Sequence, residues 1–284
     1  MSVFESFERK HDYLVCVDSD GCAMDTMNCK HIHCFGPCMV TEWGLEAWKD
    51  AILKRWNEIN LFQMTRGINR FKGLAMALQE IHNTYTSIEG IETLVDWAAN
   101  APALSNDAVE KAAADCADPA GKLCLEKALS WSKAVNRSIV ALPEELKVPF
   151  PGARDGLAAA HVFADVAVVS SANRDAVEEE WTQHGLLDHV DILLAQDCGS
   201  KAHCIKEILQ FGYDREKVLM VGDAPGDKDA ADVNGVRYFP ILVNREGESW
   251  AQLRGEALGK LSDGSFGGEY QQTLNRAFLE NLGG

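Results

Sequence analysis

The apolar run Tyr13–Val17 is followed at once by two aspartates, Asp18 and Asp20, and then by Gly21. So short an apolar run, bounded by charge before it and by glycine after it, is typical of a buried strand in a parallel sheet. The two carboxylates then lie where the chain leaves the sheet. Because ligands of open α/β sheets bind beyond the carboxyl ends of the strands, this position predicts a functional site.

Two carboxylates that face one pocket repel each other, so such a pair suits a bound cation or a shared proton. Asp18 could act as a nucleophile and Asp20 as a general acid and base, with a hard divalent cation such as Mg²⁺ held by oxygen ligands. The alternative is structural: both side chains cap backbone amides in a turn. The pair alone leaves these two interpretations open.

Two more apolar runs end in polar residues. Residues 164–169 predict a strand that ends at Ser170, and residues 218–222 predict a strand that ends at Asp223. If these strands are parallel to the first, the hydroxyl and the third carboxylate reach the same edge of the sheet as Asp18.

Residues in the following turns and helix starts are also candidates. Ser171 and Asn173 follow Ser170 with turn and helix-start chemistry and are candidate substrate contacts. Lys201 lies in the first turn of a predicted helix, where a cation opposes the helix dipole, so local stability does not explain it. Asp227 comes four residues after Asp223, in the next loop.

Together these segments resemble the haloacid dehalogenase-like (HAD) hydrolase superfamily, and within it the phosphatase-type members with a helical cap. The resemblance rests on the strings Val17-Asp18-Ser19-Asp20-Gly21, Val169-Ser170, Lys201 and Gly222-Asp223-Ala224-Pro225-Gly226-Asp227. It implies an α/β fold, a Rossmann-like parallel sheet core with an inserted all-helical cap. The expected strands lie near residues 13–18, 166–170, 191–194, 217–222 and 237–243.

The resemblance also implies a role for each residue. Asp18 would attack phosphorus to form an aspartyl-phosphate, and Asp20 would protonate the leaving alkoxide and later deprotonate the hydrolytic water. Ser170 and Lys201 would hold the remaining phosphoryl oxygens. The Mg²⁺ ligands would be Asp18, the backbone carbonyl of Asp20 and Asp223, with Asp227 as an outer or occasional direct ligand that also orients Lys201.

The expected reaction is therefore hydrolysis of a small phosphorylated metabolite, a phosphate monoester. Relatives that act as dehalogenases lack an acid two residues after the nucleophile, so Asp20 favours phosphate ester chemistry. Two alternatives stay open. A sugar phosphomutase needs the same acid, and a non-catalytic binding protein could use the same fold.

Composition restricts the possible partners and the compartment. The 284 residues carry a net charge of −16, from 27 basic and 43 acidic side chains, which argues against nucleic-acid and anionic-membrane binding. No apolar run approaches the roughly 18 residues of a membrane span, and residues 1–10 lack a signal-peptide core. Nine cysteines in apolar settings suit reduced thiols. We expect a cytoplasmic protein, either a monomer or a homodimer.

Helical periodicity assigns most of the chain between the first two motifs to the cap. The expected segments are core at 1–21, helical cap at 22–148, core again at 149–243, and a helical extension of the core at 244–284. Five tryptophans fall in the cap segment. We expect them to form the core of the cap, because amphipathic helices need such a face.

Two cap segments are candidate substrate contacts. In the first, Lys30, His31 and His33 are expected to face the substrate or the solvent. In the second, Arg66 and Arg70 could form a fork for another anionic group of the substrate, or could belong to a solvated basic helix start.

The first of these segments also carries several soft and imidazole ligands suited to zinc. Their spacing fits no standard zinc finger, so a structural zinc site stays an alternative. The residues concerned are Cys29, His31, His33, Cys34 and Cys38.

Overall fold

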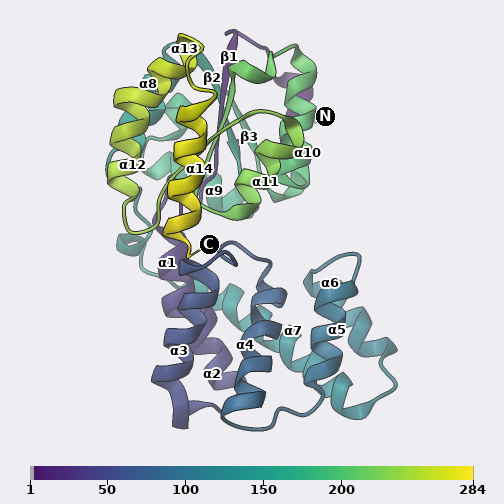
Figure 1. Cartoon of the computed structure of the whole chain (residues 1–284). Helices are drawn as coiled ribbons and strands as arrows, with labels where there is room; N and C mark the ends of the chain where they lie inside the picture. Colours follow the sequence, from purple (N-terminus) through teal and green to yellow (C-terminus); the bar gives the residue numbers. More distant parts are fainter. Residues whose placement is uncertain (1–2, 284) are drawn as a thin grey trace. The chain divides into compact units, whose positions relative to one another are not determined.

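The computed structural model describes residues 3–283 and divides the chain into two compact units. The core unit comprises Met1–Met27 and Glu144–Gly284, and the cap unit comprises Asn28–Pro143. The sequence predicts divisions between residues 21 and 22 and between residues 148 and 149, near the observed ones after Met27 and after Pro143. Residues 1, 2 and 284 of the expected core segments lie outside the described residues. Figure 1 traces both units in sequence colours.

The core unit is built on a five-stranded parallel sheet in the order β3-β2-β1-β4-β5. This arrangement confirms the predicted α/β fold class. Each strand agrees with its expected range to within two residues, except that β5 ends three residues early, at Pro240. The strands are β1 (Tyr13–Val17), β2 (Ala164–Val169), β3 (Ile192–Leu194), β4 (Val218–Gly222) and β5 (Arg237–Pro240).

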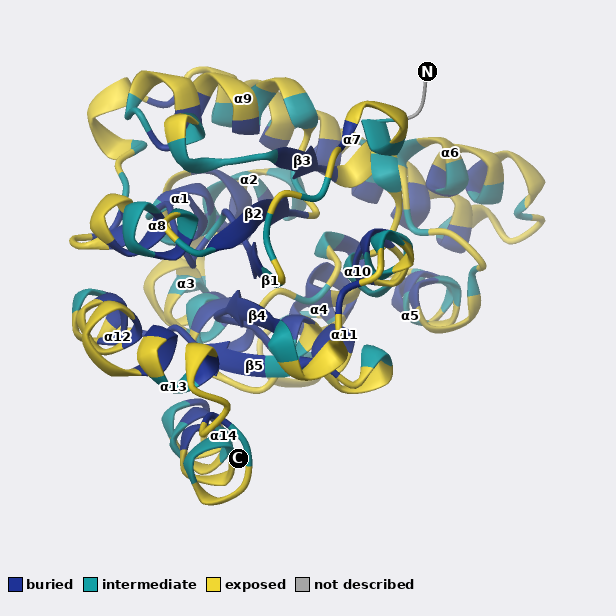
Figure 2. Cartoon of the chain, turned by 90° about the horizontal axis from the view of Figure 1, so that it is seen from above, coloured by how far each residue is buried: buried dark blue, intermediate teal, exposed yellow. Residues whose placement is uncertain are grey.

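Alternate residues of the strands pack into separate hydrophobic clusters on the two faces of the sheet. On one face, Val15 and Val17 pack with Trp181 and Trp250, and on the other Leu14 and Cys16 pack with residues of the opposite helices. Both faces are therefore buried, as apolar runs without alternation predict. Figure 2 shows the buried strands between the two helical layers. The first layer contains α8 (Ala153–His161), α9 (Arg174–Gln183), α12 (Glu246–Gln252) and α13 (Leu258–Ser262), and the second contains α10 (Lys201–Ile208) and α11 (Pro225–Asn234).

The last helix, α14 (Glu269–Asn281), closes the edge of the sheet at β5. Gln271 accepts a hydrogen bond from the backbone N–H of Tyr238 at 3.0 Å and donates one to its carbonyl at 2.7 Å. Asn281 likewise accepts from the backbone N–H of Val243 at 2.9 Å and donates to its carbonyl at 3.2 Å. These side-chain amides occupy backbone groups that another strand could otherwise pair with.

The chain leaves the core and returns to it through paired segments. The N–H of Phe150 donates to the carbonyl of Ala23, and the N–H of Asp25 donates to that of Val148. Met24 and Pro149 form an antiparallel bridge between these bonds. A short helix, α1 (Thr26–Lys30), then leads into the cap unit.

The cap unit is entirely helical in its regular structure. Trp56 and Trp131 are fully buried and pack edge to face with their ring centroids 6.1 Å apart, and the other three tryptophans pack partly buried against the same cluster. The expectation that these rings form the core of the cap is confirmed. The main helices are α2 (Gly36–Trp43), α3 (Lys49–Asn57), α4 (Arg70–Thr84), α5 (Ile91–Asn100), α6 (Asn106–Asp115) and α7 (Pro119–Val140). None of the helices within residues 3–283 combines the length and apolar character needed to cross a membrane.

Candidate active site

Asp18 stands directly beyond β1, at the carboxyl edge of the sheet. Its backbone N–H continues the ladder by donating to the carbonyl of Val221 at 3.0 Å, so the backbone that carries the carboxylate is fixed. The residue is 5% exposed. Burying a carboxylate this far is costly unless it has polar or charged partners.

Asp223 lies in the turn between β4 and α11, whereas Asp227 lies in the first turn of α11 and not in a loop as the sequence predicts. Asp227 Oδ2 accepts hydrogen bonds from the backbone N–H groups of Asp223 and Ala224, at 3.1 and 3.0 Å. A Cβ at Gly222 would lie 2.4 Å from Cβ of Asp227, so glycine is needed for this close approach. The carboxylate of Asp227 therefore holds the turn that presents Asp223.

Lys201 joins these acids from the first turn of α10. Its Nζ lies 2.8 Å from Asp18 Oδ1 and 2.5 Å from Asp227 Oδ1. Burial by itself would lower the pKa of Lys201, but the charges of Asp18 and Asp227 outweigh burial and raise the pKa. The ammonium therefore stays charged, and the two ion pairs account for a lysine that local helix stability does not explain.

A carboxylate oxygen from each of Asp18, Asp223 and Asp227 lies within 4.8 Å of the others, and all three residues are buried. Burial raises the pKa of Asp18 well above its usual value, and Asp227 and Asp223 raise it further against the opposing effect of Lys201. A divalent cation would offset this crowding of negative charge. The donors are all hard oxygens, so the residues fit Mg²⁺ or a similar ion.

Asp20 lies in the tight loop that follows Asp18. The carbonyl of Ser19 accepts hydrogen bonds from the N–H groups of Cys22, Ala23 and Met24, and Gly21 takes the left-handed φ of 87° that this turn requires. Asp20 is half-buried. These backbone bonds fold the loop back on itself.

Thr26, at the start of α1, donates a 2.5 Å hydrogen bond from its hydroxyl to Asp20 Oδ1. No sequence pattern described above assigned Thr26 a role. The contact fixes the position of the Asp20 carboxyl.

Two of the residues that follow β2 accept hydrogen bonds from nearby backbone N–H groups. Ser170 is buried beyond the strand, and its Oγ accepts from the N–H of Ala172 at 3.1 Å. Asn173 is the N-cap of α9, since its Oδ1 accepts from the N–H groups of Asp175 and Ala176. Ser171 is exposed. Asn173 was expected to contact the substrate, and the structure shows that it also caps α9.

The histidines of the cap differ in their surroundings. His31 stacks on Phe35, with ring centroids 4.5 Å apart, and its Nδ1 accepts from the indole N–H of Trp56 at 3.2 Å. His33 is exposed, whereas Lys30 is buried at the end of α1. His31 is thus held within the cap unit by aromatic neighbours.

Arg66 and Arg70 both make hydrogen bonds inside the cap unit. Arg66 is buried and donates from Nη1 to the carbonyl of Leu61 at 2.8 Å. Arg70 donates from Nη1 to Ser132 and Asn136, at 3.2 and 2.7 Å, and its guanidinium lies 5.1 Å from the ring centroid of Phe35. Burial lowers the pKa of Arg70. Packing between helices thus explains much of the position of Arg70.

The zinc alternative gains no support in the part of the chain that is described. Among residues 3–283, the acids Asp18, Asp223 and Asp227 form the one set of three potential ligands that meets the distance requirement for an ion. The cysteines and histidines of residues 29–38 form no such set there.

The comparisons with known proteins bear on the family and on the fold. Residues 120–241 match the family model described as haloacid dehalogenase-like hydrolase. This part of the chain is therefore similar to the haloacid dehalogenase-like hydrolases. The match covers Ser170, Lys201, Asp223 and Asp227 but not Asp18, which the structure brings to them. No curated protein is similar enough in sequence to count as a match.

The solved structures that are similar to this chain have low sequence identity to it. A candidate phosphoglycolate phosphatase from Lactobacillus delbrueckii subsp. bulgaricus is 13% identical, with 91% of this chain and 100% of that chain covered and a TM-score of 0.55. A candidate β-phosphoglucomutase from Thermotoga maritima is 15% identical, with 80% and 84% covered and a TM-score of 0.46. The likeness to the first of these structures supports the fold alone.

Proposed function

We propose that this HAD-superfamily protein is a magnesium-dependent phosphatase that hydrolyses a small phosphate monoester through an aspartyl-phosphate. The observation that carries the proposal is the group of three buried carboxylates, Asp18, Asp223 and Asp227, with Lys201 bound to two of them. Such a group suits a site that binds a cation and a phosphoryl group together.

In the first step, a carboxylate oxygen of Asp18 forms a bond to phosphorus while the bond from phosphorus to the ester oxygen breaks. Lys201 holds Asp18 in position through Oδ1 and offsets negative charge on the phosphoryl oxygens. Asp20 gives a proton to the departing alkoxide, which leaves as an alcohol. Ser170, at the end of the neighbouring strand, is proposed to hold another phosphoryl oxygen.

In the second step, Asp20 takes a proton from water as the water oxygen bonds to phosphorus. The bond between phosphorus and Asp18 breaks, so inorganic phosphate leaves and the carboxylate is restored. The bond from Thr26 holds Asp20 at one place for both transfers. A Mg²⁺ ion held by Asp18, the backbone carbonyl of Asp20 and Asp223, with Asp227 in support, would supply positive charge against the phosphate.

The presence of Asp20 favours this reaction over the binding-protein alternative, because binding phosphate alone does not require a second acid beside the nucleophile. A sugar phosphomutase would use the same residues. It differs in needing a bisphosphate activator and in releasing little inorganic phosphate.

The test is a panel of phosphorylated metabolites assayed for released phosphate, with Mg²⁺ or with a chelator, for the wild type and for Asp18→Asn. We expect release that requires the metal and is lost in the variant. Equal release by both proteins would refute the assignment of Asp18. Binding without turnover by the wild type would favour the binding-protein alternative, and turnover only with a bisphosphate would favour the mutase.

The roles of Lys30, His31, His33, Arg66 and Arg70 in choosing the substrate stay predictions, as do those of Ser171 and Asn173. For Arg66, the expected result is that Arg66→Ala raises KM for the best metabolite and leaves KM for a simple aryl phosphate unchanged. An equal rise for both substrates would assign Arg66 to the packing of the cap.

A further inference from the structure

We propose that two buried tryptophans, Trp181 and Trp250, are positioning residues that hold the loop bearing Asp20, residues 18–22, in its working geometry. This inference rests on the proposed function and deepens it. Trp250 lies in α12, beyond residue 241 where the family match ends. The sequence predicts a helical extension of the core at residues 244–284 and assigns it no part in the chemistry.

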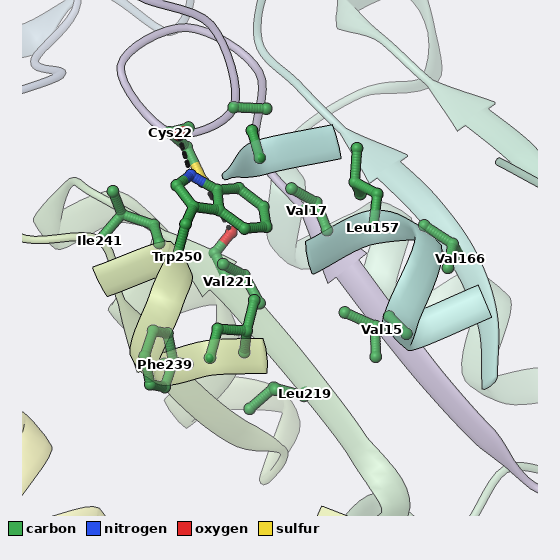
Figure 3. Packing of buried hydrophobic residues seen from close by; sticks show 14 of the residues in the cluster. Val15, Val17, Cys22, Leu157, Val166, Leu219, Val221, Phe239, Ile241 and Trp250 are labelled. Carbon is green, nitrogen blue, oxygen red and sulfur yellow. Dashed lines mark hydrogen bonds between the residues drawn. The ribbon is translucent and has the colours of Figure 1, made fainter. Parts of the chain in front are cut away.

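Each indole donates a hydrogen bond to one side of the loop. Trp250 Nε1 donates to the backbone carbonyl of Cys22 at 2.9 Å, as Figure 3 shows. Trp181 Nε1 donates to the hydroxyl of Ser19 at 2.8 Å. The two acceptors flank Asp20 in the sequence, so the indoles fix the loop on both sides of the proposed acid and base.

Neither indole can easily move. Trp181 and Trp250 are 0% and 1% exposed. A Cβ on Gly156 would lie 2.4 Å from Cε3 of Trp250, so the ring occupies the space that a side chain on α8 would otherwise fill. Because the interior is close-packed and an indole has one N–H, each donor is directed at a single acceptor.

The loop needs this support because its own backbone bonds do not reach the carbonyl of Cys22. The carbonyl of Ser19 accepts from three N–H groups and that of Met24 accepts from the N–H of Gly21, whereas the carbonyl of Cys22 accepts from Trp250, outside the loop. A buried carbonyl without a donor is unfavourable, so the bond from Trp250 favours the observed loop over alternatives. Because general acid catalysis depends on hydrogen-bond geometry, a small shift of the loop should lower the rate more than the binding of substrate.

The experiment compares Trp250→Phe and Trp181→Phe with Trp131→Phe. The control also removes an indole N–H that bonds to a backbone carbonyl in a fully buried site, that of Phe35, but within the cap unit. Two substrates are used, an alkyl phosphate and an aryl phosphate with an acidic phenol. The alkyl leaving group needs a proton from Asp20, whereas the aryl group leaves readily without one.

For both loop variants, we expect kcat for the alkyl phosphate to fall about tenfold, a part of the 10²- to 10⁴-fold that a positioned acid contributes. KM should stay within about twofold, and kcat for the aryl phosphate should fall much less, since only the proton transfer is disturbed. The control should retain wild-type kinetics on both substrates. Equal losses on both substrates, or the same loss in Trp131→Phe, would overturn the proposal.

A second measurement does not depend on activity. Hydrogen exchange at the amides of Cys22, Ala23 and Met24 should become faster in both loop variants and stay unchanged in Trp131→Phe. Unchanged exchange in both loop variants would refute the positioning role even if turnover fell. If the wild type hydrolyses no phosphate ester, the proposed function fails while this measurement still decides the positioning role.

Ser19→Ala removes the acceptor instead of the donor of the Trp181 bond. If that bond positions the loop, Ser19→Ala and Trp181→Phe should reduce kcat by similar factors, and the double variant should lose little more. Fully additive losses would show that the two side chains act independently, against the proposal.

Discussion

The two edges of the core sheet both carry buried carboxylates, but they surround them differently. At the amino edge, Asp165 accepts from the N–H groups of Lys10 and His11 and from the hydroxyl of Tyr213. At the carboxyl edge, Asp18 and Asp227 share the ammonium of Lys201, with Asp223 close by. Neutral donors surround the first carboxylate, whereas like charges crowd the second group. The difference separates an acid that holds the fold from acids suited to bind a cation and react.

The largest expected effect is at the carboxyl edge. Asp18→Asn should lower phosphate release by about 10³-fold or more, because an amide cannot replace a carboxylate nucleophile. Its free energy of unfolding should not fall, since the change relieves the burial of a charge beside Asp223 and Asp227. A kinetic assay measures the phosphate release, and urea unfolding measures the free energy of unfolding. A large loss of stability would show that Asp18, like Asp165, mainly holds the fold.

The matched change at the amino edge should give the reverse. Asp165→Asn places an amide against two backbone N–H donors, so we expect a loss of about 3 kcal/mol of unfolding free energy with kcat unchanged in the folded protein. Burial and the bond to Asp165 raise the pKa of Tyr213, and that upward shift should become smaller in the variant. Loss of activity without loss of stability would contradict the comparison.

Metal should stabilise only the carboxyl edge. At a Mg²⁺ concentration of about 100 Kd, binding to the folded protein adds about 2.7 kcal/mol, which is seen as a rise in Tm. Asp223→Asn should abolish most of this rise, whereas Asp165→Asn should keep it. A rise of equal size in Asp223→Asn would place the ion elsewhere.

The smallest effect concerns Asp191, also at the amino edge. Burial raises its pKa, but bonds from Lys10 at 2.7 Å and from the N–H of Val166 at 2.9 Å outweigh burial and lower it. A carboxyl whose pKa is lower in the folded state stabilises the fold above its unfolded pKa of about 3.9, and this contribution is lost as the pH falls through the folded value.

The wild type should therefore be more stable than Asp191→Asn by about 1 kcal/mol at pH 6. The difference should shrink as the pH is lowered from about 5 toward 3. Urea unfolding at several pH values measures it, and a difference that grew on acidification would reverse the assigned sign.

Much of the core could be predicted from local pattern. Short, continuous apolar runs such as residues 218–222 indicate buried strands. The polar residues at the ends of these runs mark one edge of a parallel sheet. The pairing of Asp18 with Lys201 follows once that edge is fixed. The role of Asn173 could not be decided in this way, because a residue after a strand can equally cap a helix or touch a ligand.

The sequence by itself determined the buried strands, the polar residues that follow them and the helical character of the inserted cap. Each of these can be recognised from the pattern of apolar and polar residues within a short segment. Only the tertiary structure decided which groups meet. Arg70 bonds to Ser132 and Asn136, and Trp250 donates to a carbonyl 228 residues earlier in the chain. Such pairings depend on long-range distance and on the satisfaction of buried polar groups, which no local pattern specifies.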